Sequence, residues 1–112
     1  MAKYERELSG DFDDFLGYIH QGIIGGSMSA SFEDGSDWQD GEVRVSMRVY
    51  ERYSMIGSNR VSLSVTLVSR GDSLFLSAIT SGGSQAVFFK INTLGEQSFL
   101  GKLQSLAESY TG

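Results

Sequence analysis

Residues 27–91 alternate apolar and polar side chains almost without a break, which constrains the fold more than any other feature. Successive side chains of a strand point to opposite faces of a sheet, so this period predicts antiparallel strands with one face on a core. We expect five successive strands joined by short turns. Their apolar rows are Met28, Ala30 and Phe32; Val43, Val45, Met47 and Val49; Val61, Leu63, Val65 and Leu67; Leu74, Leu76 and Ala78; and Val87, Phe89 and Ile91.

The connections that join the first three of these strands decide how their apolar rows align. Residues 34–41 are polar, and we expect them to form a long loop that places Phe32 opposite Val43. Pairing Val49 with Leu63 and Met47 with Val65 keeps the next two rows together, and a slip of two residues would do so equally well. A shift of one residue would instead turn a whole row to the other face. All the apolar rows are then predicted to share one face.

Two dipeptides that contain glycine mark expected hairpin turns. Arg70-Gly71 and Gly82-Gly83 each separate two alternating runs. Glycine reaches the positive φ angles of two-residue hairpin turns without steric cost, so both pairs are interpreted as turns. The serines around Gly82-Gly83 resemble part of a phosphate loop, but the lysine and the following helix of such a loop are missing.

Two segments have the apolar spacing of amphipathic helices. Asp11 is placed to cap the first, and residues 93–96 (Thr-Leu-Gly-Glu) form a capping box expected to open the second. Residues 2–8 alternate weakly and are expected to form a first strand. The helical stripes are Phe12, Phe15, Leu16, Ile19 and Ile23, and then Phe99, Leu100, Leu103, Leu106, Ala107 and Tyr110.

The order of elements predicts an α+β fold, with a strand, a helix, a five-stranded antiparallel meander and a final helix. The two helices have one apolar sheet face to cover, so both are expected on that face. We see no linker or internal repeat and therefore expect a single domain over residues 1–112.

Composition narrows the classes of function. The net charge is −5, with 9 basic and 14 acidic side chains, which argues against a nucleic-acid partner. Cysteine is absent, so disulfides and thiolate chemistry are excluded. The charged first residues do not resemble a secretory signal, and no apolar run approaches the roughly 20 residues of a membrane span. We expect a cytoplasmic protein with no membrane partner and no cofactor.

The sheet face opposite the core is the predicted site of function. Serine and threonine dominate it, but the same parity also places a group of larger side chains there. Exposed apolar groups of this kind favour a partner, and a second copy of the chain is the commonest one, so we expect a homodimer. The expected interface residues are Arg48, Tyr50, Phe75, Ile79 and Phe88.

Other candidate sites are weaker. Acids gather between Glu33 and Glu42, but their spacing does not match a calcium loop, so we interpret them as a solvated acidic loop and expect no metal. His20 is the single histidine and flanks the first helical stripe, where we expect it to pack. No catalytic triad or paired-carboxylate pattern is present, so we expect no catalytic residues and no enzyme.

Three stretches carry a resemblance to a known family. They are residues 49–53 (Val-Tyr-Glu-Arg-Tyr), 79–85 (Ile-Thr-Ser-Gly-Gly-Ser-Gln) and 88–93 (Phe-Phe-Lys-Ile-Asn-Thr). The chain resembles a small family of uncharacterised proteins of Gram-positive bacteria, a domain of unknown function, and this resemblance implies no assigned activity.

The expected element order is similar to the helix-grip and TATA-binding-protein-like folds. Helix-grip proteins often hold an apolar ligand between the sheet and the C-terminal helix. The alternative function is therefore the binding of a small molecule in an apolar cavity at that position.

Overall fold

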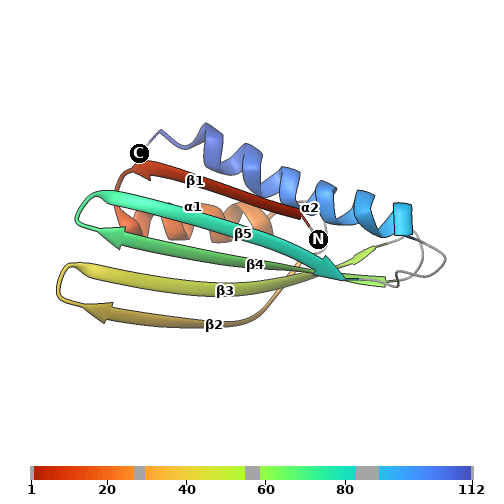
Figure 1. The fold of residues 1–112 in the computed structure, drawn as a ribbon, viewed down its shortest axis with the longest axis horizontal. Coiled ribbons are helices and arrows are strands. Elements are labelled where there is room, and N and C mark those ends of the chain that lie inside the picture. The colour runs from red at the N-terminus through yellow and green to blue at the C-terminus, as the bar shows by residue number, and fades with distance from the viewer. Residues whose placement is uncertain (1, 27–29, 55–58, 83–88, 112) are drawn as a thin grey trace.

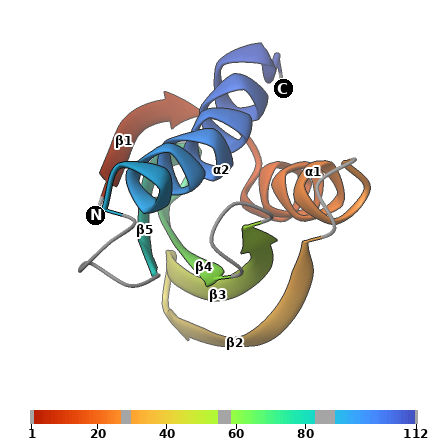
Figure 2. The same ribbon diagram turned by 90° about the vertical axis from the view of Figure 1, so that its right-hand side faces the viewer.

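The computed structural model describes residues 2–26, 30–54, 59–82 and 89–111. Five antiparallel strands form one sheet in the order β1-β5-β4-β3-β2 (Figure 1). Both helices lie on the concave side of this curved sheet (Figure 2), which confirms the α+β class and the helix placement. The elements are β1 (Ala2–Ser9), α1 (Phe12–Ile24), β2 (Ser31–Asp40), β3 (Val43–Ser54), β4 (Asn59–Arg70), β5 (Ser73–Gly82) and α2 (Phe89–Ser109).

The core lies between the helices and the strands β1, β5 and β4, and it also includes Tyr50 of β3. Asp11 caps α1 as predicted, because its carboxylate accepts a hydrogen bond from the Asp14 N–H at 2.9 Å. The predicted rows of β4 and β5 and the sheet-facing stripes of both helices are buried. The buried apolar side chains here are Val61, Leu63, Val65, Leu67, Leu74, Leu76, Ala78, Phe12, Phe15, Ile19, Ile23, Phe99, Leu100, Leu103 and Ala107.

The predicted face of β3 is wrong. Tyr50, not Val49, lies opposite Leu63, and Val49 lies opposite Ser64. This difference of one residue in register turns Val43, and with it Val45, Met47 and Val49, to the outer face. The helix-facing side of β3 carries Arg44, Ser46, Arg48 and Tyr50 instead.

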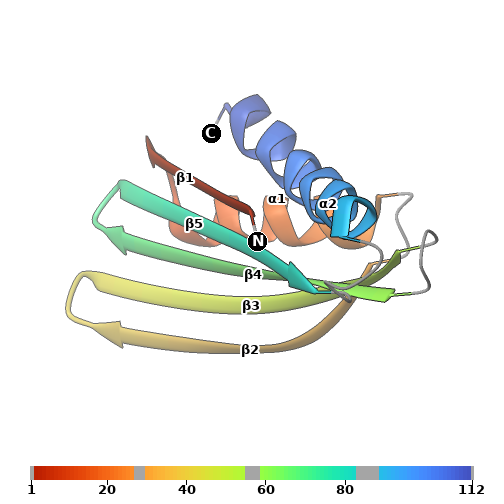
Figure 3. The same cartoon turned by 45° about the vertical axis from the view of Figure 1, so that its right-hand side comes forward.

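The expected loop at residues 34–41 is also wrong, because these residues belong almost entirely to β2. Asp40 pairs with Val43, and Gly41 makes the short turn between them with a φ of 59°. Phe32 consequently pairs with Tyr50 rather than with Val43. The β2–β3 hairpin forms one edge of the sheet as a long, curved ribbon (Figure 3).

The last strand of the expected meander is replaced by helix. α2 begins at Phe89, so Phe89 and Ile91 are helical and Thr93 lies within the helix instead of capping it. The physical reason is that β1 already pairs with β5 along its whole length, which leaves no free edge there for another strand. Val87 lies outside the described residues.

The β4–β5 hairpin preserves the predicted faces despite a different turn. Arg70 pairs with Ser73, so the turn residues are Gly71 and Asp72 rather than the predicted Arg70 and Gly71. Leu67 consequently lies opposite Leu76, two residues further along β5 than the predicted turn implies. A slip of two residues keeps every side chain on its own face. Gly82 ends β5, and Gly83 lies outside the described residues. Neither described helix is long and apolar enough to cross a membrane.

Candidate functional site

Apolar side chains, some exposed and some half-buried, form a row across the outer face of the sheet, away from the helices. Trp38 pairs with Val45, Val45 with Val68, and Val68 with Phe75, so the row crosses four strands. Met47 and Ile79 lie on the same face beside it. We call Trp38, Val45, Met47, Val68, Phe75 and Ile79 the outer patch. Trp38 is 59% exposed and Met47 49% exposed.

The structure separates the residues predicted to form one interface. Phe75 and Ile79 do share the outer face and are 38% and 41% exposed. Tyr50 is fully buried and Arg48 lies on the helix side, which corrects their predicted placement. The cause is the register of β3, which differs by one residue from the expected one. Phe88 lies outside the described residues.

Sequence reasoning missed the β2 and β3 members of the outer patch. Trp38 had been expected in a loop, and Met47 in the core. The signal that points to the correct structure is Gly41, which ends the polar run and permits a two-residue hairpin turn. The opposite charges of Arg48 and Asp37 are a second signal, because these diagonal neighbours on one face form an ion pair across β2 and β3.

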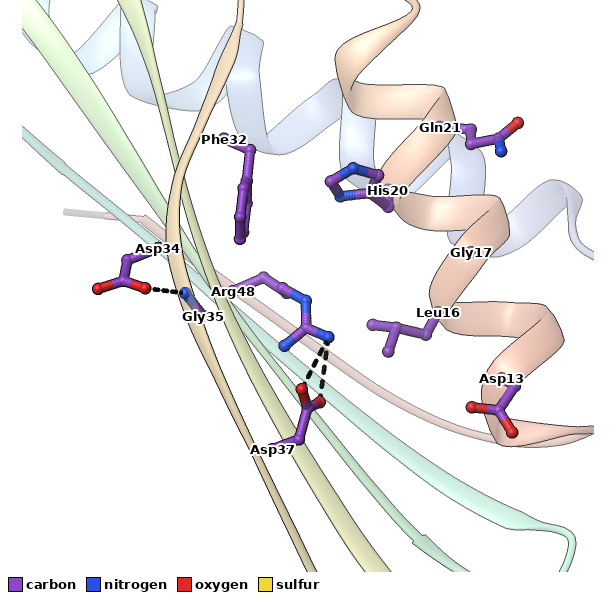
Figure 4. A pocket seen from close by; sticks show the side chains of 10 residues that line it. All are labelled: Asp13, Leu16, Gly17, His20, Gln21, Phe32, Asp34, Gly35, Asp37 and Arg48. Atoms are coloured by element: carbon purple, nitrogen blue, oxygen red, sulfur yellow. Dashed lines mark hydrogen bonds and ion pairs between the residues drawn. The ribbon is translucent and has the colours of Figure 1, made fainter.

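A cleft of about 600 Å³ lies on the other side of the sheet, between α1 and the β2–β3 hairpin (Figure 4). Helix α1 packs on α2 and β4, whereas the hairpin curves beneath it. Leu16, Gly17 and His20 line the cleft from α1, and Phe32 and Arg48 line it from the strands.

An ion pair joins α1 to the hairpin beside the cleft. Both terminal nitrogens of Arg44 donate to the carboxylate of Asp13, at 2.8 and 2.9 Å. The same guanidinium lies 4.2 Å from the centre of the Phe12 ring. The hydrogen bonds from Arg44 hold the pKa of Asp13 below its usual value, so this carboxylate is charged at neutral pH.

Aromatic side chains join the same elements two turns further along α1, at His20. His20 Nδ1 lies 2.8 Å from the Tyr50 hydroxyl oxygen, and the His20 ring meets Phe32 edge-on at 5.5 Å between ring centres. Burial raises the pKa of Tyr50 to about 12, so its hydroxyl retains its proton at neutral pH. The predicted packing role of His20 therefore includes a polar contact that the sequence did not reveal.

The floor of the cleft is a clamp between β2 and β3. The Arg48 guanidinium donates to both carboxylate oxygens of Asp37, at 3.0 and 3.2 Å. It also donates to the Met47 carbonyl at 3.0 Å, and its stem lies over Gly35. A Cβ on Gly35 would come within 2.8 Å of the Arg48 Cδ, so this glycine makes room for the arginine.

The space beneath the C-terminal helix does not provide the expected apolar cavity at its described positions. Phe99, Leu103 and Ala107 of α2 are at most 1% exposed and belong to the same apolar cluster as β4 and β5. The cleft lies instead at α1, and its lining includes charged and aromatic side chains.

These features define a small α+β protein with an antiparallel sheet, two helices on one face, an exposed apolar row on the other and a lateral cleft. The chain belongs to a family of unknown function, DUF6054, whose model matches residues 1–111. No curated protein matches it.

Proposed function

We propose that this protein is a self-associating module that packs the outer sheet face of one copy against that of a second. One observation carries the proposal. Among the described residues seven large hydrophobic side chains are exposed, and five of them lie on the outer face: Trp38, Met47, Tyr53, Phe75 and Ile79. Exposed apolar side chains gathered on one face favour a protein partner.

The charge distribution of the outer face supports the same proposal. Nine outer positions in the middle of three adjacent strands carry no charge, although 21% of the residues in the chain are charged. The charged outer residues of these strands, Glu51, Arg60 and Arg70, lie toward the strand ends. Charged groups are depleted from the cores of protein interfaces, because their desolvation is costly. These nine are Val45, Met47, Val49, Ser64, Thr66, Val68, Phe75, Ser77 and Ile79.

The size of this face suits a second copy of the chain. Strands about 4.8 Å apart and about 3.4 Å per residue give a face of roughly 24 by 30 Å, or about 700 Å². A stable interface buries about 800 Å² per partner, so the interface would have to use the whole face. Two sheets can meet in this way at a separation of about 10 Å, and a two-fold axis would repeat every contact.

The test is Phe75→Glu, which would place two carboxylates in the symmetric interface. Its matched control is Ile24→Glu on α1, because Ile24 and Phe75 have the same exposed fraction, 38%. Light scattering coupled to gel filtration should give twice the 12.2 kDa chain mass for the wild type and for Ile24→Glu. Phe75→Glu should give the mass of one chain with an unchanged circular dichroism spectrum. A monomeric wild type at high concentration, or a dimeric Phe75→Glu, refutes the proposal.

The absence of enzymatic activity, the cellular location and the bacterial origin are further proposals, which rest on the sequence. We propose a non-enzymatic, cytoplasmic protein that binds no nucleic acid, on the basis of its acidic charge and the lack of any catalytic pattern in the sequence. A Gram-positive bacterial origin rests on the family resemblance alone. Recovery of the protein in the membrane fraction of lysed cells would contradict the proposed location.

A further inference from the structure

The cleft between α1 and the β2–β3 hairpin is large enough for a small molecule. Its volume of about 600 Å³ falls within the range of roughly 300–1,000 Å³ that is typical of ligand sites. The Arg44–Asp13 pair and the His20–Tyr50 pair each join α1 to β3 beside it. Because both walls are tied together in this way, the cleft has a defined width.

One wall of the cleft presents an aromatic surface. Phe32 is 45% exposed and projects from β2 toward α1 (Figure 4). Its ring is held by His20 at 5.5 Å and by Tyr50 at 5.8 Å between ring centres. Leu16 lines the opposite wall. A flat ring placed between Phe32 and Leu16 would bury apolar surface on both sides.

The charges around the cleft favour a cation over an anion. Arg48 already donates to Asp37 and to the carbonyls of Met47 and Ser36. Arg44 is bound to Asp13 through both terminal nitrogens. The Asp37 and Asp13 side chains are nevertheless 65% and 69% exposed. A carboxylate has about four lone-pair sites, so both can accept further hydrogen bonds.

His20 supplies a polar group beside the aromatic wall. Its Nδ1 lies 2.8 Å from the hydroxyl oxygen of the buried Tyr50, so this ring nitrogen already takes part in a hydrogen bond. The other ring nitrogen, Nε2, can pair with a ligand hydroxyl, because a hydroxyl group can both donate and accept a hydrogen bond.

From these observations we infer that the cleft binds a small aromatic amine. Its ring would lie on Phe32, and its ammonium group would approach Asp37. This ligand site lies on the opposite side of the sheet from the outer patch, so it is independent of self-association. The monomeric Phe75→Glu variant should therefore retain it.

The first experiment compares three probes by amide chemical-shift titration. Tyramine combines a ring, a hydroxyl and an ammonium group; 4-hydroxyphenylacetate keeps the ring and hydroxyl but is an anion; butylamine has no ring. Tyramine should give saturating shifts at Gly17, His20 and Gly35, and the anion should bind at least roughly ten-fold more weakly, because it meets carboxylates. Butylamine should be weaker as well.

Three outcomes overturn the inference. The first is the absence of saturating shifts with tyramine up to about 10 mM, a concentration at which even a weak site with a Kd of about 1 mM would be nearly saturated. The second is equal or tighter binding of 4-hydroxyphenylacetate. The third is a set of shifts outside the cleft.

The second experiment uses variants of the cleft itself. Gly17→Leu fills the space, because a Cβ at Gly17 meets no atom within 4 Å, and it should abolish tyramine binding. Gly101→Ala in α2, where a Cβ also has no neighbour within 4 Å, controls for replacing a helical glycine and should bind as the wild type does. Retained tyramine binding in a folded Gly17→Leu variant would place the ligand elsewhere.

The role of the Asp37 carboxylate in binding the ammonium group is tested by Asp37→Asn, which removes the negative charge. Loss of this carboxylate should weaken tyramine binding by roughly ten-fold. Asp40→Asn is the matched control, since Asp40 lies on the outer face of the same strand. Equal effects of the two changes would show that only net charge matters and would overturn the proposed role of Asp37.

Discussion

The face that β3 turns toward the helices can be tested by comparing Tyr50→Ala with Met47→Ala. In the structure, Tyr50 is fully buried on the helix side and Met47 is 49% exposed on the outer side. The simple alternation of apolar residues would reverse these roles. Tyr50→Ala should therefore be severe, and Met47→Ala should be mild.

The magnitudes follow from burial and from one hydrogen bond. Truncation of a buried aromatic side chain to alanine costs about 3–5 kcal/mol. Loss of the Tyr50 partner of His20 adds roughly 0.5–1.5 kcal/mol. Full burial of a methionine is worth about 1.5–3 kcal/mol, so the half-exposed Met47 should contribute about 1 kcal/mol. The expected difference between the variants is at least about 2 kcal/mol.

The assay is equilibrium unfolding in urea, followed by far-ultraviolet circular dichroism at low protein concentration. Low concentration matters because Met47 belongs to the outer patch, and dimer formation would add to its apparent contribution. If Tyr50→Ala leaves too little folded protein, Tyr50→Leu gives a smaller loss with the same sign. A loss from Met47→Ala equal to or larger than that from Tyr50→Ala would refute the register of β3.

Two further predictions concern the Tyr50 hydroxyl and the glycine turns. Burial raises the pKa of Tyr50 from 10.0 to about 12, so the contribution of its protonated hydroxyl to stability is complete below pH 10 and is lost as the pH rises through about 12. In urea melts over this interval, Tyr50→Phe should therefore lose less stability than the wild type. Parallel plots of stability against pH for the two proteins would contradict this. Gly82→Ala should cost at least about 2 kcal/mol more than Gly41→Ala in the same melts, because a clash adds to the φ penalty. At Gly82 the new Cβ would clash with the Arg60 carbonyl oxygen, whereas at Gly41 it has no neighbour within 4 Å. Equal losses would show that the positive φ alone matters.

The candidate surfaces were only partly predictable. Phe75 and Ile79 could be placed on the outer face because β5 has a clear alternation whose inner row is fully buried. Trp38 and Met47 could not, since their faces depend on the turn at Gly41 and on the register of β3. The cleft was not predictable, because it depends on how far α1 stands from the hairpin.

The sequence by itself determined the α+β class, the Asp11-capped helix and the core rows of β4 and β5. Alternation specifies which residues of a strand share a face, but it does not specify which face that is. Valine and other β-branched residues suit a strand whether or not it is covered, so the apolar row of β3 was compatible with either side. Only the tertiary structure decided this. A one-residue difference in register placed Tyr50 beneath His20 and Met47 in solvent, and the pairing of β1 with β5 closed the edge that another strand would have needed.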